Sequence, residues 1–89
     1  MALRWTKTAL RTLDEIAAYI AQDNPEHATR FVRELRDSTQ QLEAFPGLGR
    51  AGRVHGTREL VVHKNYLAIY RVREGVVEIL RIHHSARMY

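Results

Sequence analysis

The first half of the chain carries apolar residues at steps of three and four, the spacing that places side chains on one face of a helix. Residues 6–22 form one such stripe, with Thr6 as the expected N-cap. Residues 25–45 form a second, because Pro25 suits the first helical position and Asn24 can cap it. The joint is short, so we expect an antiparallel helical hairpin. The stripes consist of Leu10, Leu13, Ile16, Ala17 and Ile20, then Ala28, Phe31, Val32, Leu35, Thr39, Leu42 and Phe45.

The periodicity changes in the second half of the chain. Residues 46–57 hold four of the five glycines and show no repeat, which indicates a loop. Three segments rich in Val, Ile, Leu and Tyr follow at residues 59–63, 66–72 and 76–83, and the joints between them are short enough for hairpins. This pattern predicts a three-stranded antiparallel meander, to which residues 3–5 could add an N-terminal edge strand.

The middle segment of this meander is apolar at four consecutive positions, from Leu67 to Tyr70. Such a run indicates either a strand buried on both faces or a strand with one face left for a partner. An apolar sheet face must be covered, and the helical pair is the only element available to cover it. We therefore expect one α+β domain over residues 1–89, in which a two-helix antiparallel hairpin packs on a three- to four-stranded antiparallel sheet.

The composition narrows the class of protein. A chain of 89 residues with 45% hydrophobic residues buries a modest core in one domain, which excludes a multidomain enzyme. Because it contains no cysteine, it has no disulfide, no thiolate nucleophile and no cysteine zinc site, and it suits a reducing cytoplasm. The sequence shows neither an apolar run long enough to span a bilayer nor a signal peptide, so we expect a cytoplasmic protein with no membrane partner.

Positive charge is concentrated in the second half of the chain. Residues 1–49 contain six basic and seven acidic side chains, a net charge of −1, whereas residues 50–89 contain eight basic and three acidic ones, a net charge of +5. Four of the five histidines also lie in the second half. Such a surface attracts a polyanion, whether a nucleic acid, a ribosome or an acidic protein, but the charge alone does not choose among them.

Several kinds of catalytic site are disfavoured by the spacing of the residues. His83 and His84 are neighbours on a predicted strand, so their side chains point to opposite faces and do not readily share a metal ion. Ser38 lies in a helical stripe and Ser85 lacks a glycine elbow, which argues against a serine nucleophile. The glycines of residues 46–57 are not followed by the lysine of a phosphate-binding loop. We therefore expect no metal and no cofactor.

The remaining candidates for chemistry lie at the start of the predicted meander and at the end of the chain. A metal-free ribonuclease uses histidine or arginine to handle the proton of the 2′-hydroxyl, arginine to hold phosphate and tyrosine to stack on a base. The simpler interpretation, which composition favours, is a basic strand end whose side chains are solvated or bind an acidic partner. The residues concerned are Arg58, Arg81, His83, His84, Arg87 and Tyr89.

One longer pattern connects these features, and it covers nearly the whole chain. It includes the early Trp5 and the ending of the second helical stripe, and its order and spacing resemble the RelE/ParE superfamily of type II toxin–antitoxin toxins. The resemblance implies a small cytoplasmic bacterial toxin with a helical hairpin on an antiparallel sheet, active in growth inhibition and plasmid stabilization. It also implies a cognate antitoxin whose extended segment wraps around the toxin in a hetero-oligomer. The strings that carry it are Leu42-Glu43-Ala44-Phe45-Pro46-Gly47, Gly56-Thr57-Arg58-Glu59-Leu60-Val61-Val62-His63, Asn65-Tyr66, Ile69-Tyr70-Arg71-Val72 and Val77-Glu78-Ile79-Leu80-Arg81-Ile82-His83-His84.

Members of this superfamily differ in their target. RelE-like members cut mRNA in the ribosomal A site, whereas ParE-like members poison DNA gyrase without nuclease activity. The RelE pattern has two lysines and an arginine at three positions that match Arg58, Leu60 and Leu67 in this chain. Only one of the three is cationic here, so the stabilisation of a phosphate by that set would be weakened. The string from Thr57 to Val62 and the closing residues 83–87 look closer to the ParE branch, which predicts a DNA gyrase inhibitor without a catalytic residue. Its target-binding candidates are Arg50, Arg53, Arg58, Arg81 and Arg87.

Two alternatives to gyrase inhibition stay open. One is a ribonuclease whose partners are the ribosome and mRNA, and the other is a non-toxic adaptor that binds an acidic protein. For the antitoxin, the apolar middle strand together with Trp5 and Phe31 near the helices leaves grooves that an amphipathic helix or an added strand could fill. In the ribonuclease, Arg58, Arg81 and Arg87 would hold phosphate, His83 or His84 would transfer the proton, and Tyr89 would stack on a base or orient the attacking hydroxyl.

Overall fold

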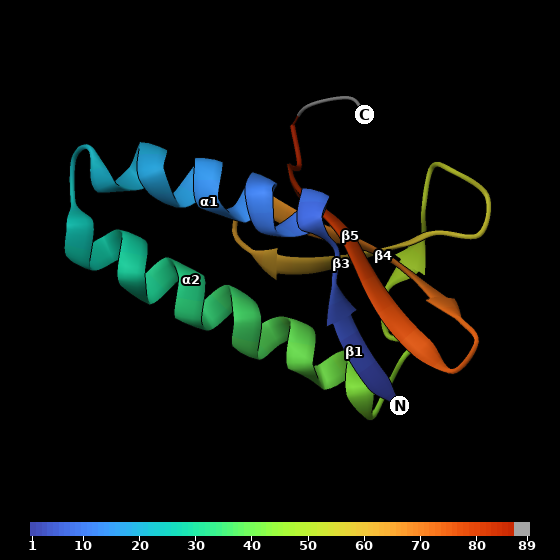
Figure 1. The fold of residues 1–89 in the computed structure, drawn as a ribbon. Helices are drawn as coiled ribbons and strands as arrows, with labels where there is room; N and C mark the ends of the chain where they lie inside the picture. Colours follow the sequence, from blue (N-terminus) through green and yellow to red (C-terminus); the bar gives the residue numbers. More distant parts are fainter. Residues whose placement is uncertain (87–89) are drawn as a thin grey trace.

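Two helices lie on one face of a five-stranded sheet in the computed structural model, which describes residues 1–86 (Figure 1). The strand order is β1-β5-β4-β3-β2. The α+β class and the helical hairpin packed on a sheet are as predicted. The elements are β1 (Ala2–Trp5), α1 (Lys7–Ala21), α2 (Pro25–Gln40), a 3-10 helix (Gln41–Glu43), β2 (Arg50–Ala51), β3 (Arg58–His63), β4 (Tyr66–Arg73) and β5 (Val76–His84).

Side-chain caps explain where both helices begin. Thr6 Oγ1 accepts a hydrogen bond from the main-chain N–H of Ala9 at 3.1 Å. Asn24 Oδ1 accepts one from the main-chain N–H of His27 at 3.0 Å, and Pro25 is the first residue of α2. These caps satisfy amide groups that have no partner inside the first helical turn, and both confirm the prediction.

The second helix ends earlier than predicted. The chain passes from α2 into the 3-10 helix at Gln41, and Pro46 a few residues later cannot continue a helix. Phe45 was predicted as the last residue of the apolar stripe, but its exposed fraction is 66%. The periodicity therefore extended beyond the point at which the backbone leaves the helix.

The sheet differs from the predicted one in two respects. The meander of β3, β4 and β5 is antiparallel as predicted, but β1 pairs with β5 in parallel, so the whole sheet is mixed. In addition, β2 lies inside the predicted loop and pairs with β3, with Arg50 opposite Glu59. Strand direction depends on where the folded chain returns to the sheet, and a two-residue strand carries no periodicity, so neither feature was visible in the pattern.

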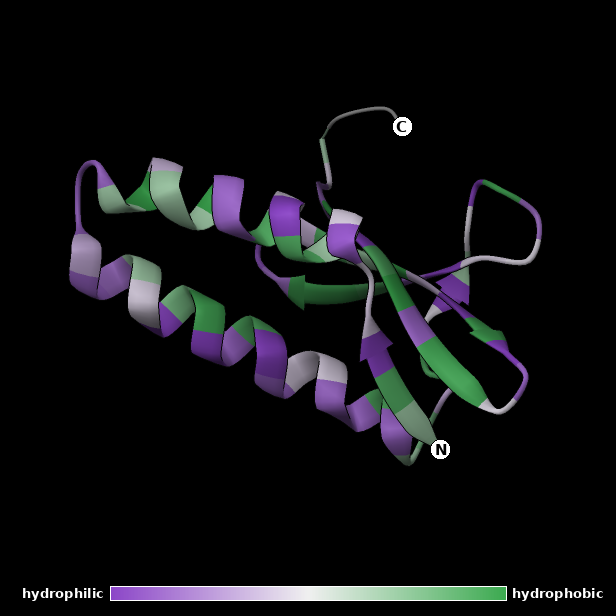
Figure 2. Ribbon diagram, in the orientation of Figure 1, coloured by the Kyte–Doolittle hydropathy of each residue, from purple (hydrophilic) through white to green (hydrophobic). Residues whose placement is uncertain are grey.

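The core lies between the helices and the sheet. Figure 2 shows apolar residues concentrated on the central strands, with the helices alternating between apolar and polar positions. Leu13 of α1 and Phe31 and Leu35 of α2 pack against the inner face of the sheet and are at most 3% exposed. In β4, residues 67–70 are all at most 5% exposed, so the strand is buried on both faces, which was the first of the two interpretations.

One buried hydroxyl ties the loop before β2 to the sheet. Tyr70, which is fully buried, donates a hydrogen bond from its hydroxyl to the carbonyl oxygen of Pro46 and accepts one from the N–H of Gly49, both at 2.8 Å. A Cβ atom on Gly49 would lie 2.8 Å from the Tyr70 hydroxyl and 2.7 Å from the carbonyl oxygen of Glu59. The close approach explains why glycine occupies this position.

Candidate target-binding surface

The face of the sheet that the helices leave uncovered carries a row of residues paired across four strands. Leu60, Ala68 and Ile82 belong to the core, so their sequence neighbours point to the opposite face. These neighbours are Glu59, Ile69 and Arg81, which are opposite one another across β3, β4 and β5, and Arg50 of β2 is opposite Glu59. The row spans about 14 Å between its two terminal arginines, at the usual strand spacing.

A second row on this open face is an ion-pair triad. Glu78 of β5 is 5% exposed and lies opposite both Arg71 of β4 and Arg4 of β1. Its carboxylate accepts a hydrogen bond from Nε of Arg71 at 2.8 Å and forms an ion pair with Arg4. The side chain of Arg71 remains 39% exposed and that of Arg4 remains 63% exposed. A buried carboxylate is tolerated here because two guanidinium groups compensate its loss of hydration.

Glu59 repeats this arrangement in the first row. Its side chain is 10% exposed, and Oε1 lies 3.0 Å from Nε of Arg50, whose side chain is 66% exposed. Arg73 lies two residues beyond Arg71 on the same face, opposite Val76. The described strands therefore present five arginines and two buried glutamates on the open face, a net charge of +3, and the positive groups are the exposed ones. The arginines are Arg4, Arg50, Arg71, Arg73 and Arg81.

The predicted site residues are divided between different surfaces. Arg50 and Arg81 share the open face, whereas Arg58 pairs with Tyr70 and directs its guanidinium group to the loop before β2. Nη1 of Arg58 donates to the carbonyl oxygen of Gly49 at 2.8 Å and lies 3.5 Å from that of Gly47. Arg58 therefore holds a loop in place and is not part of the open face. Arg53 is exposed in the connection between β2 and β3, and the predicted Arg87 and Tyr89 lie outside the described residues.

The two candidate histidines have different surroundings. His83 is opposite Leu67 on the open face and is 5% exposed, whereas His84 is opposite Tyr66 on the face that the helices cover. The ring of His84 packs edge-on against that of Tyr66, with centroids 5.2 Å apart. His84 is partly exposed, so it is the more accessible imidazole for any proton transfer.

A groove of about 450 Å³ lies between α1 and the end of β5. Arg81, His83 and His84 of β5 are among the residues that line it, and His84 is the one whose side chain lies on the helix-covered face. The wall formed by α1 adds the carboxylate of Glu15 and the exposed ring of Tyr19. These groups are of the types that hold phosphate and transfer protons. Among the described residues, no group of three or more histidine and acidic side chains is placed to hold a metal ion.

Sequence reasoning missed Arg4, Arg71 and Arg73 as residues of the charged face. The contact between Arg71 and Glu78 did have a signal in the sequence. A two-residue turn at Glu74-Gly75 sets the register of the hairpin so that Arg71 lies opposite Glu78. Both turn residues have positive φ, 52° and 75°, as this type of hairpin turn requires. The contribution of Arg4 depended on the parallel pairing of β1, which the pattern did not reveal.

The part of the chain that the structure describes contains no helix long and apolar enough to cross a membrane.

Residues 3–89 match a family model described as the ParE toxin of type II toxin–antitoxin system, parDE. Two relatives are similar over almost their whole length. "Putative toxin Y4kP" of Sinorhizobium fredii is 42% identical over 88 residues, which are 98% of this chain and 91% of the relative. "Toxin RelE2" of Caulobacter vibrioides is 39% identical over 84 residues, which are 94% of each chain.

Two solved structures share the arrangement of helices and strands. The first is the "Chromosomal ParDE TA system from P. aeruginosa", with a TM-score of 0.84 and 33% identity over 94% of this chain and 95% of that one. The second is the toxin–antitoxin complex RelBE2 from Mycobacterium tuberculosis, with a TM-score of 0.60 and 25% identity over 97% and 92% of the two chains. The similarity extends over the helices and the sheet, so it concerns the fold as a whole.

Proposed function

Because the chain belongs to the ParE toxin family of type II toxin–antitoxin systems, we propose that it acts as a poison of DNA gyrase and that a cognate antitoxin neutralises it. In this function no residue of the chain carries out catalysis. The toxin binds the topoisomerase and favours a state in which the cleaved DNA is not resealed. Gyrase acts in the cytoplasm, so the proposal places the toxin there.

The observation that carries this proposal is the burial of the positions at which the ribonuclease branch has cationic groups. Leu60 and Leu67 occupy two of them, and they are 9% and 5% exposed. Arg58 occupies the third, but its guanidinium group is directed to the carbonyl oxygens of Gly49 and Gly47. Stabilisation of a phosphate in a ribonuclease transition state requires cationic donors aimed at one point, and these three positions do not supply it.

The open face of the sheet fits a binding role. Its exposed charged groups are guanidiniums, and its two glutamates are buried beneath them. A net charge of +3 on one face attracts DNA or an acidic protein surface, and the attraction weakens as salt screens it. We assign target binding to this face, with Arg81 and Arg50 from the predicted set and Arg73 as an added candidate.

One specific feature favours a ribosome-dependent mRNA endoribonuclease as the second candidate. Arg81, His84 and Glu15 line one groove together with Tyr66, and one relative carries the name "Toxin RelE2". In that case Arg81 would hold phosphate, and His84, as the more exposed imidazole, would be the proton-transfer group. His83 is too buried to reach an RNA without a rearrangement of the strand end.

The antitoxin part of the proposal rests on the solved relatives. One is described as a ParDE TA system and the other as a toxin–antitoxin complex, so we expect this chain to form a hetero-oligomer with its own antitoxin. Induction of the toxin without the antitoxin should stop growth. Continued division of induced cells that contain the folded protein would favour the non-toxic adaptor instead.

The experiment that separates the two targets is a paired assay of the purified toxin. One tube measures gyrase supercoiling and cleaved plasmid, and the other measures mRNA cleavage on programmed ribosomes. We expect cleaved plasmid to accumulate while the mRNA stays intact. Cuts in the mRNA together with normal supercoiling would overturn gyrase inhibition, and loss of those cuts in His84→Ala would then identify the proton-transfer group.

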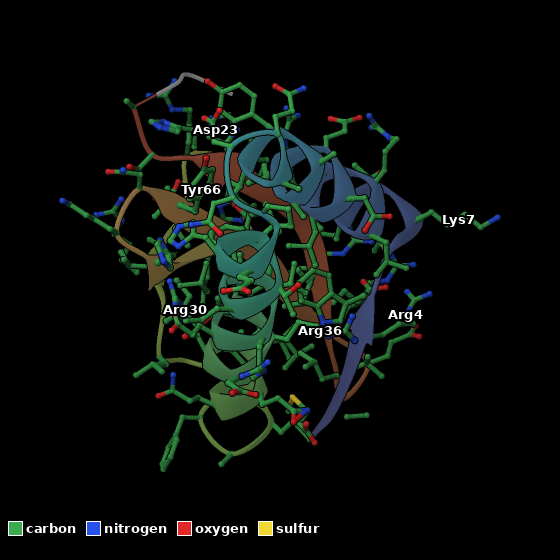
Figure 3. All side chains as sticks on the ribbon, turned by 90° about the vertical axis from the view of Figure 1, so that its left-hand side faces the viewer. Arg4, Lys7, Asp23, Arg30, Arg36 and Tyr66 are labelled. Carbon is green, nitrogen blue, oxygen red and sulfur yellow. The ribbon has the colours of Figure 1, made fainter. Side chains whose placement is uncertain are left out.

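Charge reversal tests the binding surface in the same assay. Arg81→Glu should weaken gyrase inhibition at least about tenfold, since one charge-assisted contact contributes about 1.5–3 kcal/mol. Arg30→Glu is the matched control, because Arg30 is exposed on α2, far from the open face (Figure 3). Equal inhibition by both variants would show that the open face does not bind the target.

A further inference from the structure

A pocket of about 320 Å³ lies on the open face, at the end of the sheet where β1 begins and β4 turns into β5 (Figure 1). The parallel pairing places Ala2 opposite Val76 and Arg4 opposite Glu78, so the start of the chain lies beside the hairpin turn. Three guanidinium groups from two strands adjoin this one space. The residues that line the pocket are Arg4, Arg71, Arg73, Glu74, Val76 and Glu78.

The guanidinium groups of the pocket keep donors that a ligand can use. Nε of Arg71 donates to the buried carboxylate of Glu78 at 2.8 Å, and Arg4 forms an ion pair with the same carboxylate. A guanidinium group has five N–H donors, so one such contact leaves the others. Among residues 1–86, the exposed side chain of Arg73 forms no ion pair. Glu78 therefore fixes two guanidinium groups from below, and the charge of Arg73 stays uncompensated.

The surface around the pocket lacks the apolar centre that a protein partner would bury. Among the described strands, Val61 is the one exposed large apolar side chain directed to the open face, since its neighbours Leu60 and Val62 belong to the core. Val61 lies opposite Leu67, which is four residues and about 13 Å along β4 from Arg71. Protein–protein interfaces are apolar and depleted of charge at their centre, whereas protein–DNA interfaces are polar and strongly positive. The pocket fits the second kind.

The type and the spacing of the cations suit a row of phosphates. All three are arginines, whose planar guanidinium group binds two oxygens of one phosphate, and the two lysines of the chain, Lys7 and Lys64, lie outside the pocket. Arg71 and Arg73 are two residues apart on β4, about 6.6 Å, and Arg4 lies two strands from Arg71, about 10 Å. Phosphates follow one another at about 3.4 Å of helix axis along each strand of duplex DNA. The three groups can therefore hold neighbouring phosphates of one backbone.

We propose that this pocket binds the phosphate backbone of duplex DNA, so that this end of the open face meets the DNA of the gyrase–DNA complex. Arg4, Arg71 and Arg73 donate to phosphate oxygens, and Glu78 holds the first two of these arginines in position. Contacts of this kind position a protein on DNA without reading its sequence. This inference rests on the proposed function, because it names the part of the target complex that the open face meets.

Titration of a short, labelled duplex DNA of mixed sequence with the purified toxin, followed by fluorescence anisotropy without gyrase, tests the proposal. Arg73→Gln is the informative variant, because loss of Arg4 or Arg71 would leave the buried Glu78 with fewer partners. At about 0.1 M salt, Arg73→Gln should weaken binding about five- to tenfold and reduce the slope of log Kd against log salt concentration by about 0.9, the effect of one phosphate contact. Arg30→Gln, exposed on α2, is the matched control and should change the affinity less than about twofold.

Glu74→Gln tests the same pocket in the opposite direction. Glu74 is exposed in the hairpin turn and lines the pocket, so its carboxylate repels a phosphate there. Removal of this charge should tighten DNA binding about twofold, as expected for two charges about 8 Å apart in water. An unchanged or weaker affinity would contradict the placement of the DNA backbone at this pocket.

The remaining outcomes separate this inference from the proposed function. Equal affinities of Arg73→Gln and Arg30→Gln, or no binding of the duplex at low salt, would overturn DNA binding by the pocket, and gyrase inhibition in the paired assay would then leave the proposed function standing. Binding of inorganic phosphate without binding of the duplex would also overturn it and assign the pocket to a small anion. DNA binding that depends on Arg73 in a toxin that does not inhibit gyrase would support the pocket and overturn the proposed function.

Discussion

Replacing Tyr70 by phenylalanine isolates the contact that fixes the loop before β2. The ring of Tyr70 is fully buried, and only its hydroxyl would be removed. That hydroxyl is held between the carbonyl oxygen of Pro46 and the N–H of Gly49, each at 2.8 Å. The substitution should therefore leave the packing of the ring intact and remove two hydrogen bonds at once.

The loss of stability in Tyr70→Phe depends on the polar main-chain groups that are left without a hydrogen-bond partner. Two ordinary hydrogen bonds contribute about 1 kcal/mol each. Gly49 is buried, so its N–H would lose its partner without gaining water, at a cost of about 1–3 kcal/mol. Because the terms overlap, we expect the free energy of unfolding to fall by about 2–4 kcal/mol for Tyr70→Phe. A domain of this size has about 5–15 kcal/mol in total, so the loss is large.

Urea unfolding followed by circular dichroism measures this loss. The midpoint should fall while the slope m stays unchanged, since the same surface is exposed on unfolding. Tyr19→Phe is the matched control, because Tyr19 is 71% exposed and its hydroxyl can be replaced by water. A Tyr70→Phe variant within about 0.5 kcal/mol of the wild type, the range of a neutral surface change, would refute the argument that this hydroxyl anchors the loop.

Two further substitutions test the close contacts of the fold. Gly49→Ala should lower the free energy of unfolding by about 1–3 kcal/mol, because its Cβ would meet Glu59 and Tyr70 at 2.7 and 2.8 Å. Gly47→Ala, with nothing within 4 Å, should change it by less than about 1 kcal/mol, and similar losses for both would contradict the steric explanation. Thr12→Val should cost about 1–3 kcal/mol in thermal or urea unfolding, since it leaves the N–H of Ile82 unpaired. Thr8→Val on the exposed face of α1 should stay within about 0.5 kcal/mol, and a neutral Thr12→Val would show that α1 does not cap the β5 edge.

The features predicted correctly from the sequence are those with local causes. Thr6 and Asn24 act as caps three residues before the amides that they bind, and the helical stripes need only the spacing of neighbouring turns. The meander follows from short joints between apolar segments, which force consecutive strands to pair. In each case the partners are close along the chain.

The features missed by the sequence depend on distant partners. The parallel pairing of β1 with β5 joins the two ends of the chain. The contact between Thr6 and Ile79, for example, connects residues that are 73 positions apart in the sequence. Arg58 looked equivalent to Arg50 and Arg81 in composition, and only the loop geometry at Gly49 directs it elsewhere. Charge along the sequence therefore identified which half was basic, but not which arginines share a face.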